Sequence, residues 1–257
     1  MENLNNILQG FEPISLLKMD DVKLLKRADT KFIFNCNSLC DILEEITPNY
    51  RILETQTGRV NRYRTLYFDT LDFSCYTSHH NGKLNRTKIR SREYIDSKIA
   101  FMEVKFKSNK GQTNKTRIPI PVIETTLSTI SKTFIDSNSF YKSEDLRPAI
   151  WNNFSRLTFV HKEKKERLTI DYNIEFRKID NEDSIKISHL IIAEVKQEKA
   201  SIDSDFISVM KKKHIRQSSM SKYCIGTVLT NKTIKSNNFK EYINKINKLK
   251  NVRSVVA

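Results

Sequence analysis

The sequence has few of the residues that build phosphate loops or membrane spans. Only five glycines occur among 257 residues, and neither a GxxxxGK[ST] nor a GxGxxG pattern is present. A P-loop or a dinucleotide-binding fold is therefore unsupported, because both folds need glycines where the backbone approaches phosphate. No apolar run reaches the length of a membrane span, so the sequence predicts no transmembrane helix.

Cysteines are also scarce, and their spacing argues against a disulfide framework or a metal site. The four cysteines contain no CxxC pair. This pattern favours buried, reduced thiols in a cytoplasmic protein. The first residues, MENLNNILQG, lack both a basic and an apolar segment, so no secretory signal is predicted.

Acidic residues are too few to balance the basic ones. Lys and Arg number 45 against 30 Asp and Glu, and the formal net charge is +15. A surplus of this size predicts an anionic partner, which composition alone leaves open among nucleic acid, acidic lipid and a polyanionic small molecule.

Apolar periodicity predicts an α+β protein with about eight strands in a large antiparallel sheet or barrel. We expect a single domain over 1–257, with a helical lead-in at about 1–25 and a basic helical tail at about 236–257. Within the lead-in, 12–25 is expected to be helical, and an Asn/Ser cap predicts a helix at 37–46. The predicted strands cover 26–34, 62–70, 79–95, 101–107, 111–122, 152–163, 166–178 and 188–199, with helix and loop at 123–147 and helices from 201 onward.

The charged faces of these strands are the strongest functional signal. In RTKIRSRE, four cations alternate along one face: Arg86, Lys88, Arg90 and Arg92. Same-face neighbours lie about 7 Å apart, and each like pair costs roughly 2 kcal/mol at an effective dielectric of 20. Such a face is either fully solvated or neutralised by an anion.

Other strands repeat this pattern with occasional carboxylates. One charged face alone is typical of a solvated strand, but cations on six strands fit a barrel with a polar interior that binds a polyanion. The few carboxylates then suit a hard divalent cation that bridges phosphates. The other same-face sets are Arg27, Asp29 and Lys31; Glu103, Lys105 and Lys107; Lys115 and Arg117; Arg167, Thr169 and Asp171; and Glu194 and Lys196.

Seven stretches, in order along the chain, resemble the VTC-domain polyphosphate polymerases of the triphosphate tunnel metalloenzyme (CYTH-like) superfamily. The resemblance spans roughly residues 12–230 and is closest to the bacterial stand-alone members. It implies an eight-stranded antiparallel tunnel that transfers the ATP γ-phosphoryl group to growing polyphosphate, with Mn²⁺ or Mg²⁺ as cofactor. The stretches are RADTKF, TLYFDT, HHNGKLNRTKIRSREY, FMEVKFKSNKGQTNKTRI, RLTIDYNIEF, IIAEVKQEK and SSMSKYCIG.

The resemblance also implies a set of site residues. Glu194 corresponds to the family's metal-binding glutamate, with Glu103 and Asp29 as further candidate ligands. Two positions depart from the family pattern: Arg27 replaces a carboxylate found in hydrolytic relatives, and Ser219 replaces a lysine. Lys88 and Lys107 join the set because they share the charged faces, and Lys222 is expected to begin a helix. The implied catalytic cations are Arg90, Arg92, Lys105 and Lys196, and the implied phosphate-binding residues are Lys31, Arg27, Lys88, Lys107, Lys115, Arg117, Arg156, Arg167, Lys222 and Ser219.

Three other functions remain open at this stage. A tunnel-fold triphosphatase is expected to carry more inward carboxylates, and a polyphosphate or inositol-phosphate sensor could dispense with Glu194. Nucleic-acid binding is disfavoured because no RRM, KH or helix-turn-helix pattern appears. The expected partners are therefore ATP and inorganic polyphosphate. His79 and His80, beside the Asn81–Gly82 turn, are expected to be solvated loop residues.

Overall fold

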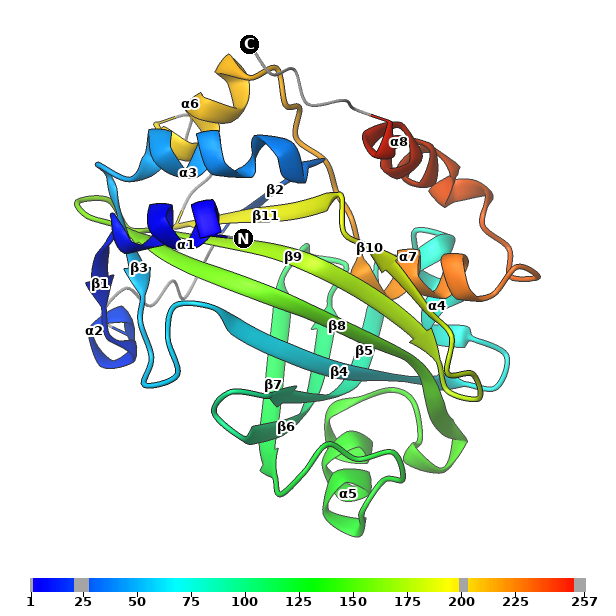
Figure 1. Cartoon of the computed structure of the whole chain (residues 1–257). Coiled ribbons are helices and arrows are strands. Elements are labelled where there is room, and N and C mark those ends of the chain that lie inside the picture. The colour runs from blue at the N-terminus through cyan, green and yellow to red at the C-terminus, as the bar shows by residue number, and fades with distance from the viewer. Residues whose placement is uncertain (1, 21–27, 199–202, 252–257) are drawn as a thin grey trace.

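One large, mostly antiparallel sheet with flanking helices gives the chain an α+β, tunnel-like fold (Figure 1). The computed structural model describes residues 2–20, 28–198 and 203–251. The predicted fold class is confirmed, and eight strands make up the main path of the sheet. In spatial order they are β2 (Ala28–Asn35), β11 (Leu190–Gln197), β9 (Glu166–Lys178), β8 (Leu146–His161), β4 (Asn61–Thr70), β5 (Arg86–Tyr94), β6 (Ile99–Lys107) and β7 (Thr113–Ile120).

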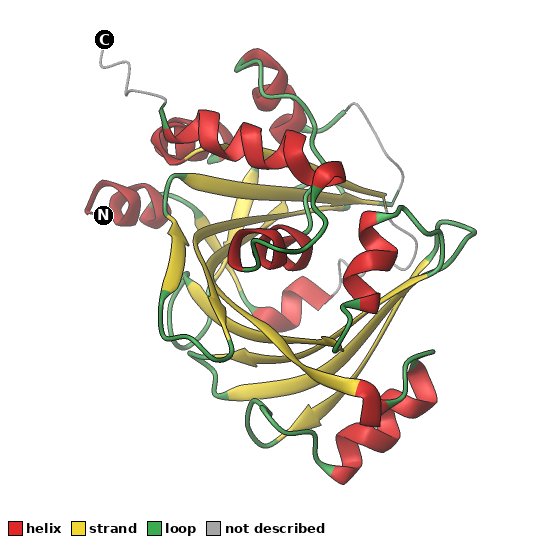
Figure 2. Ribbon diagram, turned by 90° about the vertical axis from the view of Figure 1, so that its right-hand side faces the viewer, coloured by secondary structure: helices red, strands yellow, loops and turns green. Residues whose placement is uncertain are grey.

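The sheet is strongly curved, but hydrogen bonds do not close it into a barrel (Figure 2). Strands β2 and β7 lie at the two ends of the path, and within the described ranges they do not pair with each other. The edge of β2 is covered instead by residues 217–218: Gln217 bridges Phe32, and the Ser218 N–H donates to the Lys31 carbonyl at 2.8 Å. The expectation of a closed barrel is therefore wrong in this respect.

Three short strands were missed by the sequence patterns. Strand β1 (Glu12–Ile14) pairs in parallel with β3 (Tyr50–Leu53), and β10 (Ser184–Ile187) pairs with β9. The prediction of helix over 12–25 is wrong at β1, because that segment gains its hydrogen bonds from a strand far along the chain. Residues 21–25 of that prediction lie outside the described residues.

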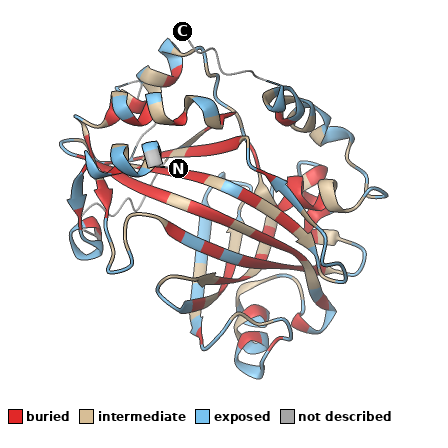
Figure 3. Cartoon of the chain, viewed as in Figure 1, coloured by how far each residue is buried: buried red, intermediate tan, exposed pale blue. Residues whose placement is uncertain are grey.

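The outer face of the sheet packs against helices. The alternation predicted for 101–107 is confirmed there, since Met102 and Val104 are buried against α5 while Glu103 and Lys105 face inward. Helices α1, α3 and α6 cover the other half of this face (Figure 3). The helices are α1 (Glu2–Gln9), α2 (Leu16–Asp20), α3 (Leu39–Ile46), α4 (Ser74–His80), α5 (Thr129–Asn138), α6 (Asp205–Lys212), α7 (Lys222–Thr230) and α8 (Lys240–Lys250), with short 3₁₀ turns at Cys36–Ser38, Ser143–Asp145 and Asn237–Phe239.

Helix α7 packs on the inner, concave face, where it buries an apolar cluster with β8 and β9. Gly226 permits this approach, because a Cβ atom there would lie 2.4 Å from Phe176 Cδ1 and 2.8 Å from Ile150 Cδ1. Larger residues at 226 would therefore push the helix away from the sheet. The inner face is thus apolar where α7 covers it, and it is polar past the N-terminal end of this helix.

The predicted basic tail includes helix α8, which packs beside α7 and the ends of β2 and β11. Ile246 is buried, and the Asn35 side-chain amide donates to the Leu249 carbonyl at 2.6 Å. Residues 252–257 lie outside the described residues. None of the helices in the described ranges combines the length and apolar character needed to cross a membrane.

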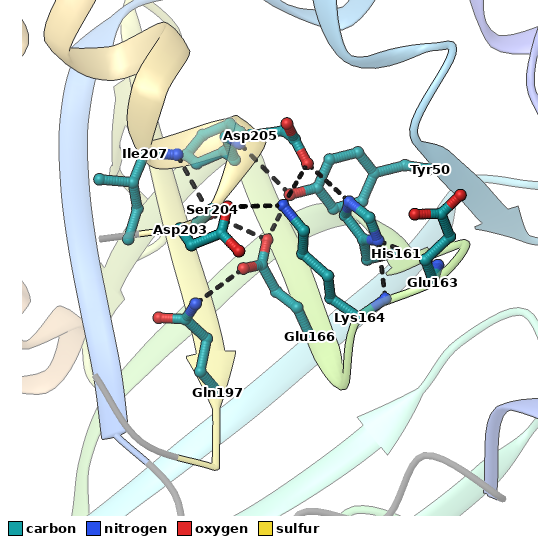
Figure 4. A network of polar contacts seen from close by, with 11 residues as sticks. Tyr50, His161, Glu163, Lys164, Glu166, Gln197, Asp203, Ser204, Asp205 and Ile207 are labelled. Carbon is teal, nitrogen blue, oxygen red and sulfur yellow. Dashed lines mark hydrogen bonds and ion pairs between the residues drawn. The ribbon is translucent and has the colours of Figure 1, made fainter. Parts of the chain in front are cut away.

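A buried carboxylate fixes the start of helix α6 to the β8–β9 hairpin (Figure 4). Glu166 is 1% exposed and accepts hydrogen bonds from the hydroxyl of Tyr50, the amide of Gln197 at 3.0 Å and the hydroxyl of Ser204 at 3.1 Å. Ser204 also caps α6 by accepting from the Ile207 N–H. Burial raises the pKa of Glu166 above its usual value, and the Tyr50 and Ser204 hydrogen bonds only partly offset this.

The same network contains a histidine of defined tautomer. His161 Nδ1 accepts from the backbone N–H groups of Glu163 and Lys164, at 3.0 and 2.9 Å. Its Nε2 therefore carries the proton that is shared with Asp205, 2.6 Å away. His161 therefore links the backbone of the β8–β9 hairpin to Asp205 in the first turn of α6, and we assign it a structural role.

We expect Glu166→Gln to change how stability depends on pH. Because the folded pKa of Glu166 is raised, its favourable contribution is complete below its unfolded value of about 4.5 and is lost as pH rises through the folded value. Urea unfolding between pH 4 and 8 should therefore show the parent losing stability relative to the glutamine variant as pH increases. Parallel curves for the two proteins would show that Glu166 does not titrate in this range.

Candidate functional site

Charged residues of β5, β6 and β7 form the first part of the site. The strand register places Glu103 of β6 between Arg90 of β5 and Arg117 of β7. It likewise places Lys105 between Lys88 and Lys115. Directly opposed residues of antiparallel strands share a face, so all six lie on the inner face. The alternation that the sequence predicts for each strand is therefore repeated on its neighbours. Strand pairing thus places five cations around one carboxylate on the inner face.

Glu103 is the centre of this array. It is 1% exposed, and its Oε2 accepts from Nε and Nη2 of Arg90 at 2.6 Å each, while Oε1 pairs with Lys115. Although burial disfavours the carboxylate, the charges of Arg90, Arg92 and Lys115 hold the pKa of Glu103 well below its usual range. Glu103 is thus an enclosed counter-ion that keeps the cations in place.

The second part of the site lies on β2, β11 and β9. Glu194 pairs with Lys31 at 2.7 Å and with Lys196 at 2.8 Å, and Lys196 also donates to Thr169 Oγ1 at 3.3 Å. These two lysines hold the pKa of Glu194 well below its usual range despite its burial. Unlike Glu103, the Glu194 side chain is 18% exposed, so a ligand can reach it from the tunnel.

A third carboxylate, Asp171, was not among the predicted site residues. It is 3% exposed, receives Nε and Nη2 of Arg156 at 2.5 and 2.8 Å, and pairs with Lys222. Lys222 is the first residue of α7, as the sequence predicts. The position of Asp171 on the same strand face as Arg167 was the available signal, but its two partners are distant in sequence.

Arg92 is buried and, unlike Arg90 and Arg156, it forms no ion pair with the residues that the structure describes. It is 6% exposed and donates from Nε to Thr65 Oγ1 at 3.1 Å. Its guanidinium carbon lies 5.5 Å from the ring centroids of both Tyr63 and Phe154. Burial and the charge of Arg90 lower its pKa, so the protein maintains a poorly neutralised charge here.

Residues from the two ends of the open sheet face one another across the inner space. Burial, followed by the positive charge of Lys88, lowers the pKa of Lys105 to about 8, and Lys31 on β2 contributes to the same effect. Lys31 also lowers the pKa of Lys88 on β5, after burial and Arg90. The curvature of the sheet therefore creates a single cationic site even though β2 and β7 are unpaired.

The pKa of Lys105 predicts a pH dependence for anion binding. Lys105 gains its full charge only below pH 8, so the affinity for tripolyphosphate should fall about tenfold more between pH 7 and 9 in the parent than in Lys105→Met. The ligand-free protein should show the opposite trend: protonated Lys105 lowers stability below pH 8, and this cost is relieved as pH rises toward 10.5. Calorimetric titration and thermal unfolding at the two pH values measure both trends.

A neighbouring lysine provides the control for that experiment. Lys107 is exposed at the end of β6, so Lys107→Met should keep the steep pH dependence of the parent. An identical pH dependence in the parent and in Lys105→Met would contradict the assignment of Lys105 to the binding site.

The structure separates the remaining predicted residues from this central cluster. Arg117, Ser219 and Asp29 are exposed, as is Lys107. Arg167 is half-buried and donates to the Met19 carbonyl at 2.9 Å. Lys88, by contrast, belongs to the cluster and donates to Ser221 Oγ at 2.9 Å. Arg27 lies outside the described residues. The cluster itself contains Lys31, Lys88, Arg90, Arg92, Lys105, Lys115, Arg156, Lys196 and Lys222 with the carboxylates Glu103, Asp171 and Glu194.

The two predicted loop histidines lie instead at the end of helix α4. His80 is 3% exposed, and its Nε2 accepts from the Asn238 N–H at 3.4 Å. His79 is half-buried close to Lys88, and burial followed by the charges of Lys88 and Arg86 lowers its pKa to about 2. The expectation of solvated loop residues is wrong because α4 extends up to the turn.

The carboxylates of the site fit a divalent cation that is held by one protein carboxylate together with substrate phosphates. No group of three or more His, Cys, Asp or Glu side chains gathers within the described ranges, so a site made wholly of protein ligands is not supported there. Mg²⁺ is commonly held by one or two carboxylates together with substrate phosphates. Glu194 suits this role because it is accessible, whereas Glu103 is enclosed by Arg90 and Lys115.

The chain was compared with solved structures, with curated proteins and with protein-family models. The structure is similar to a candidate adenylate cyclase from Vibrio parahaemolyticus, with 12% identity, 79% of this chain and 99% of that chain covered, and a TM-score of 0.46. It is also similar to a candidate adenylyl cyclase from Hippeastrum that is described as having a dominant triphosphatase activity, with 13% identity, coverage of 80% and 97%, and a TM-score of 0.46. A conserved hypothetical protein from Pyrococcus furiosus gives 10% identity, coverage of 77% and 99%, and a TM-score of 0.42. The comparison with curated proteins finds no significant match.

Fold and site together define a tunnel-like α+β protein whose inner face is strongly cationic. The family model for the VTC domain matches residues 26–231. This match covers most of the chain, and the chain therefore belongs to the VTC domain family, as its motifs indicate.

Proposed function

We propose that this protein is a polyphosphate polymerase that transfers the γ-phosphoryl group of ATP to a growing polyphosphate chain. The observation that supports it best is the surplus of cations on one inner face. Each of the carboxylates Glu103, Asp171 and Glu194 is shared between two cations. Arg92 and Lys88 add charge that pairs with no carboxylate of the described residues. A flexible, repetitive polyanion is the ligand class that such a surface accommodates.

Phosphate binding requires the ion pairs to exchange partners. In the ligand-free protein Lys31 and Lys196 are held by Glu194. A phosphate oxygen that accepts hydrogen bonds from these lysines replaces the carboxylate as their partner. The exchange needs no large movement of the strands. The arginines add planar donors that can bind two phosphate oxygens at once.

The reaction needs positioning and charge stabilisation more than proton transfer. The terminal oxygen of the polyphosphate chain forms a bond to the γ-phosphorus, the bond from that phosphorus to the β–γ bridging oxygen breaks, and ADP leaves with the bonding electrons. The attacking phosphate oxygen is already ionised near neutral pH, so no general base is required. Arg90, Arg92 and Arg156 then stabilise the charge on the transferred group.

A divalent cation, Mn²⁺ or Mg²⁺, completes this proposal. Glu194 is the residue that would hold it, with the phosphates as further ligands. When bound, the cation neutralises charge that develops on the leaving oxygen. The contribution of this chain is to release Glu194 for that role when Lys31 and Lys196 turn to the phosphates.

The scarcity of accessible carboxylates favours this function over triphosphate hydrolysis. A hydrolase of this fold is expected to need further inward carboxylates to orient water through a second cation. In the described part of the inner face, Glu103 and Asp171 are each enclosed by two cations, and Asp29 lies exposed at the start of β2. A polyanionic acceptor is therefore expected to compete better than water for the γ-phosphoryl group.

The product of the reaction tests the proposal. Purified protein is incubated with ATP and Mn²⁺, and the product is sized on a gel before and after treatment with an exopolyphosphatase. We expect long, phosphatase-sensitive chains that are absent when the metal is chelated. Binding of ATP without any chain growth would instead support a sensor, and release of orthophosphate alone would support a triphosphatase.

A further inference from the structure

Part of the inner face is built from rings, which phosphate binding does not explain. The strand register places Phe101 opposite Arg92, and Tyr94 opposite Ile99 on the next strand. Both rings are only half-buried, and their centroids are 5.8 Å apart in an edge-to-face arrangement. Ile99 beside them is 48% exposed. These residues therefore form an accessible apolar surface directly beside the cations that are proposed to bind phosphate.

Arg117 extends this surface as a flat group. Its guanidinium carbon lies over the Phe101 ring, 4.3 Å from the ring centroid, so the two groups are in cation–π contact. Within the described residues Arg117 forms no ion pair, because its cross-strand neighbour Glu103 is already bound by Arg90 and Lys115. We call Tyr94, Phe101 and Arg117 the aromatic rim.

The other wall of the site has a different chemistry. There Lys196 stands opposite Asp29 and Arg167 in the strand register, and all three side chains are charged. Arg156 lies between the two walls, because its strand β8 stands between β9 and β4 in the order of the sheet. One wall thus suits phosphate alone, whereas the other combines cations with a stacking surface.

We propose that the aromatic rim binds the base of the nucleoside triphosphate, while the cations beside it bind the phosphates. A nucleobase is a flat, uncharged ring that stacks on aromatic side chains and on guanidinium groups. This inference rests on the proposed function, since it assigns the base of the same donor nucleotide. Inorganic polyphosphate has no ring, so the rim distinguishes the donor from the product without any contact to phosphate.

Binding of two ligands that share the triphosphate group tests this assignment. A non-hydrolysable ATP analogue and inorganic tripolyphosphate are titrated into the full-length parent and into Phe101→Leu. We expect the affinity for the analogue to fall about tenfold in the variant, as typical base stacking predicts, while the affinity for tripolyphosphate is unchanged. Arg117→Lys, which keeps the charge on an exposed strand, should show the same selective loss. Phe140→Leu, which removes an 81% exposed ring that packs against Phe106 outside the rim, should show none.

The possible failures are distinguishable. An equal loss for both ligands overturns the base assignment, because the rim would then act through charge or through the fold. Unchanged binding of the analogue in both Phe101→Leu and Arg117→Lys also overturns it. If the parent binds neither ligand, the proposed function itself fails.

Discussion

Replacing Arg92 with methionine should weaken triphosphate binding while leaving the fold as stable as before, or more stable. Arg92 is buried without an ion pair to any described residue, and only Thr65 accepts a hydrogen bond from its Nε. Desolvating such a charge is costly, so an apolar side chain of similar length removes a penalty. Charge-assisted hydrogen bonds contribute about 1.5–3 kcal/mol each, which predicts roughly 10- to 100-fold weaker binding of tripolyphosphate.

Calorimetric titration and thermal unfolding measure these opposite effects in one protein. Arg64 offers a matched control, because it lies on the neighbouring strand β4, is 46% exposed and pairs with Glu93. Arg64→Met should leave tripolyphosphate binding unchanged and lower stability slightly. A destabilised Arg92→Met protein that binds tripolyphosphate normally would assign Arg92 to the fold and not to the ligand.

The second large effect is expected for Glu194→Gln. The amide keeps the shape of the side chain but removes the accessible inner-face carboxylate that Lys31 and Lys196 share. Turnover should fall by at least about 100-fold, as is typical when a group that stabilises transition-state charge is lost. Tripolyphosphate binding in the absence of metal should persist or tighten, because Lys31 and Lys196 lose the anion that competes with phosphate.

Glu198→Gln is the appropriate control for this substitution. Glu198 follows the same strand, but its side chain is 55% exposed and pairs with the exposed Lys165, so turnover should be unaffected. Rates of ADP formation across a metal titration, together with metal-free calorimetry, separate catalysis from binding. Coincident metal titration curves for the parent and Glu194→Gln would show that this carboxylate does not hold the cation.

The sequence was sufficient to predict most of the strands and to predict which side chains face the core and which face the site. In the stretch 101–107, strict alternation identified Met102 and Val104 as core residues and Lys105 as an inner-face residue, and the structure confirms this. Two neighbouring strands supplied the rest of the array, because antiparallel pairing carries the alternation of one strand onto the next.

The alternation fails where a backbone irregularity reverses the faces of a strand. On β9, Leu168 and Ile170 pack on the outer face, and an unbroken strand would place Ile174 there too. A register shift opposite Phe154, with Asn173 at a φ of 52°, moves Ile174 into the inner cluster beneath α7. Such a bulge leaves no clear trace in one sequence, since asparagine adopts this conformation without glycine.

Contacts between distant segments were equally hidden. Asp171 was visible as a same-face carboxylate, but only the fold brings Arg156 and the first residue of α7, Lys222, to it. The parallel pairing of β1 with β3 joins Glu12–Ile14 to residues some forty positions further along the chain. Local patterns therefore predicted which residues face the site but not how its carboxylates are neutralised.

A polymerase requires that phosphate, and not water, accepts the γ-phosphoryl group. The most direct test is the phosphate balance during the first few turnovers of the parent protein with ATP and Mn²⁺, measured as ADP, free orthophosphate and phosphate held in polymer. We expect ADP formation with little orthophosphate, and polymer phosphate that equals the ADP released and disappears on exopolyphosphatase treatment. Orthophosphate equal to ADP, with no polymer at any time, would show that the protein hydrolyses ATP and would contradict the polymerase assignment.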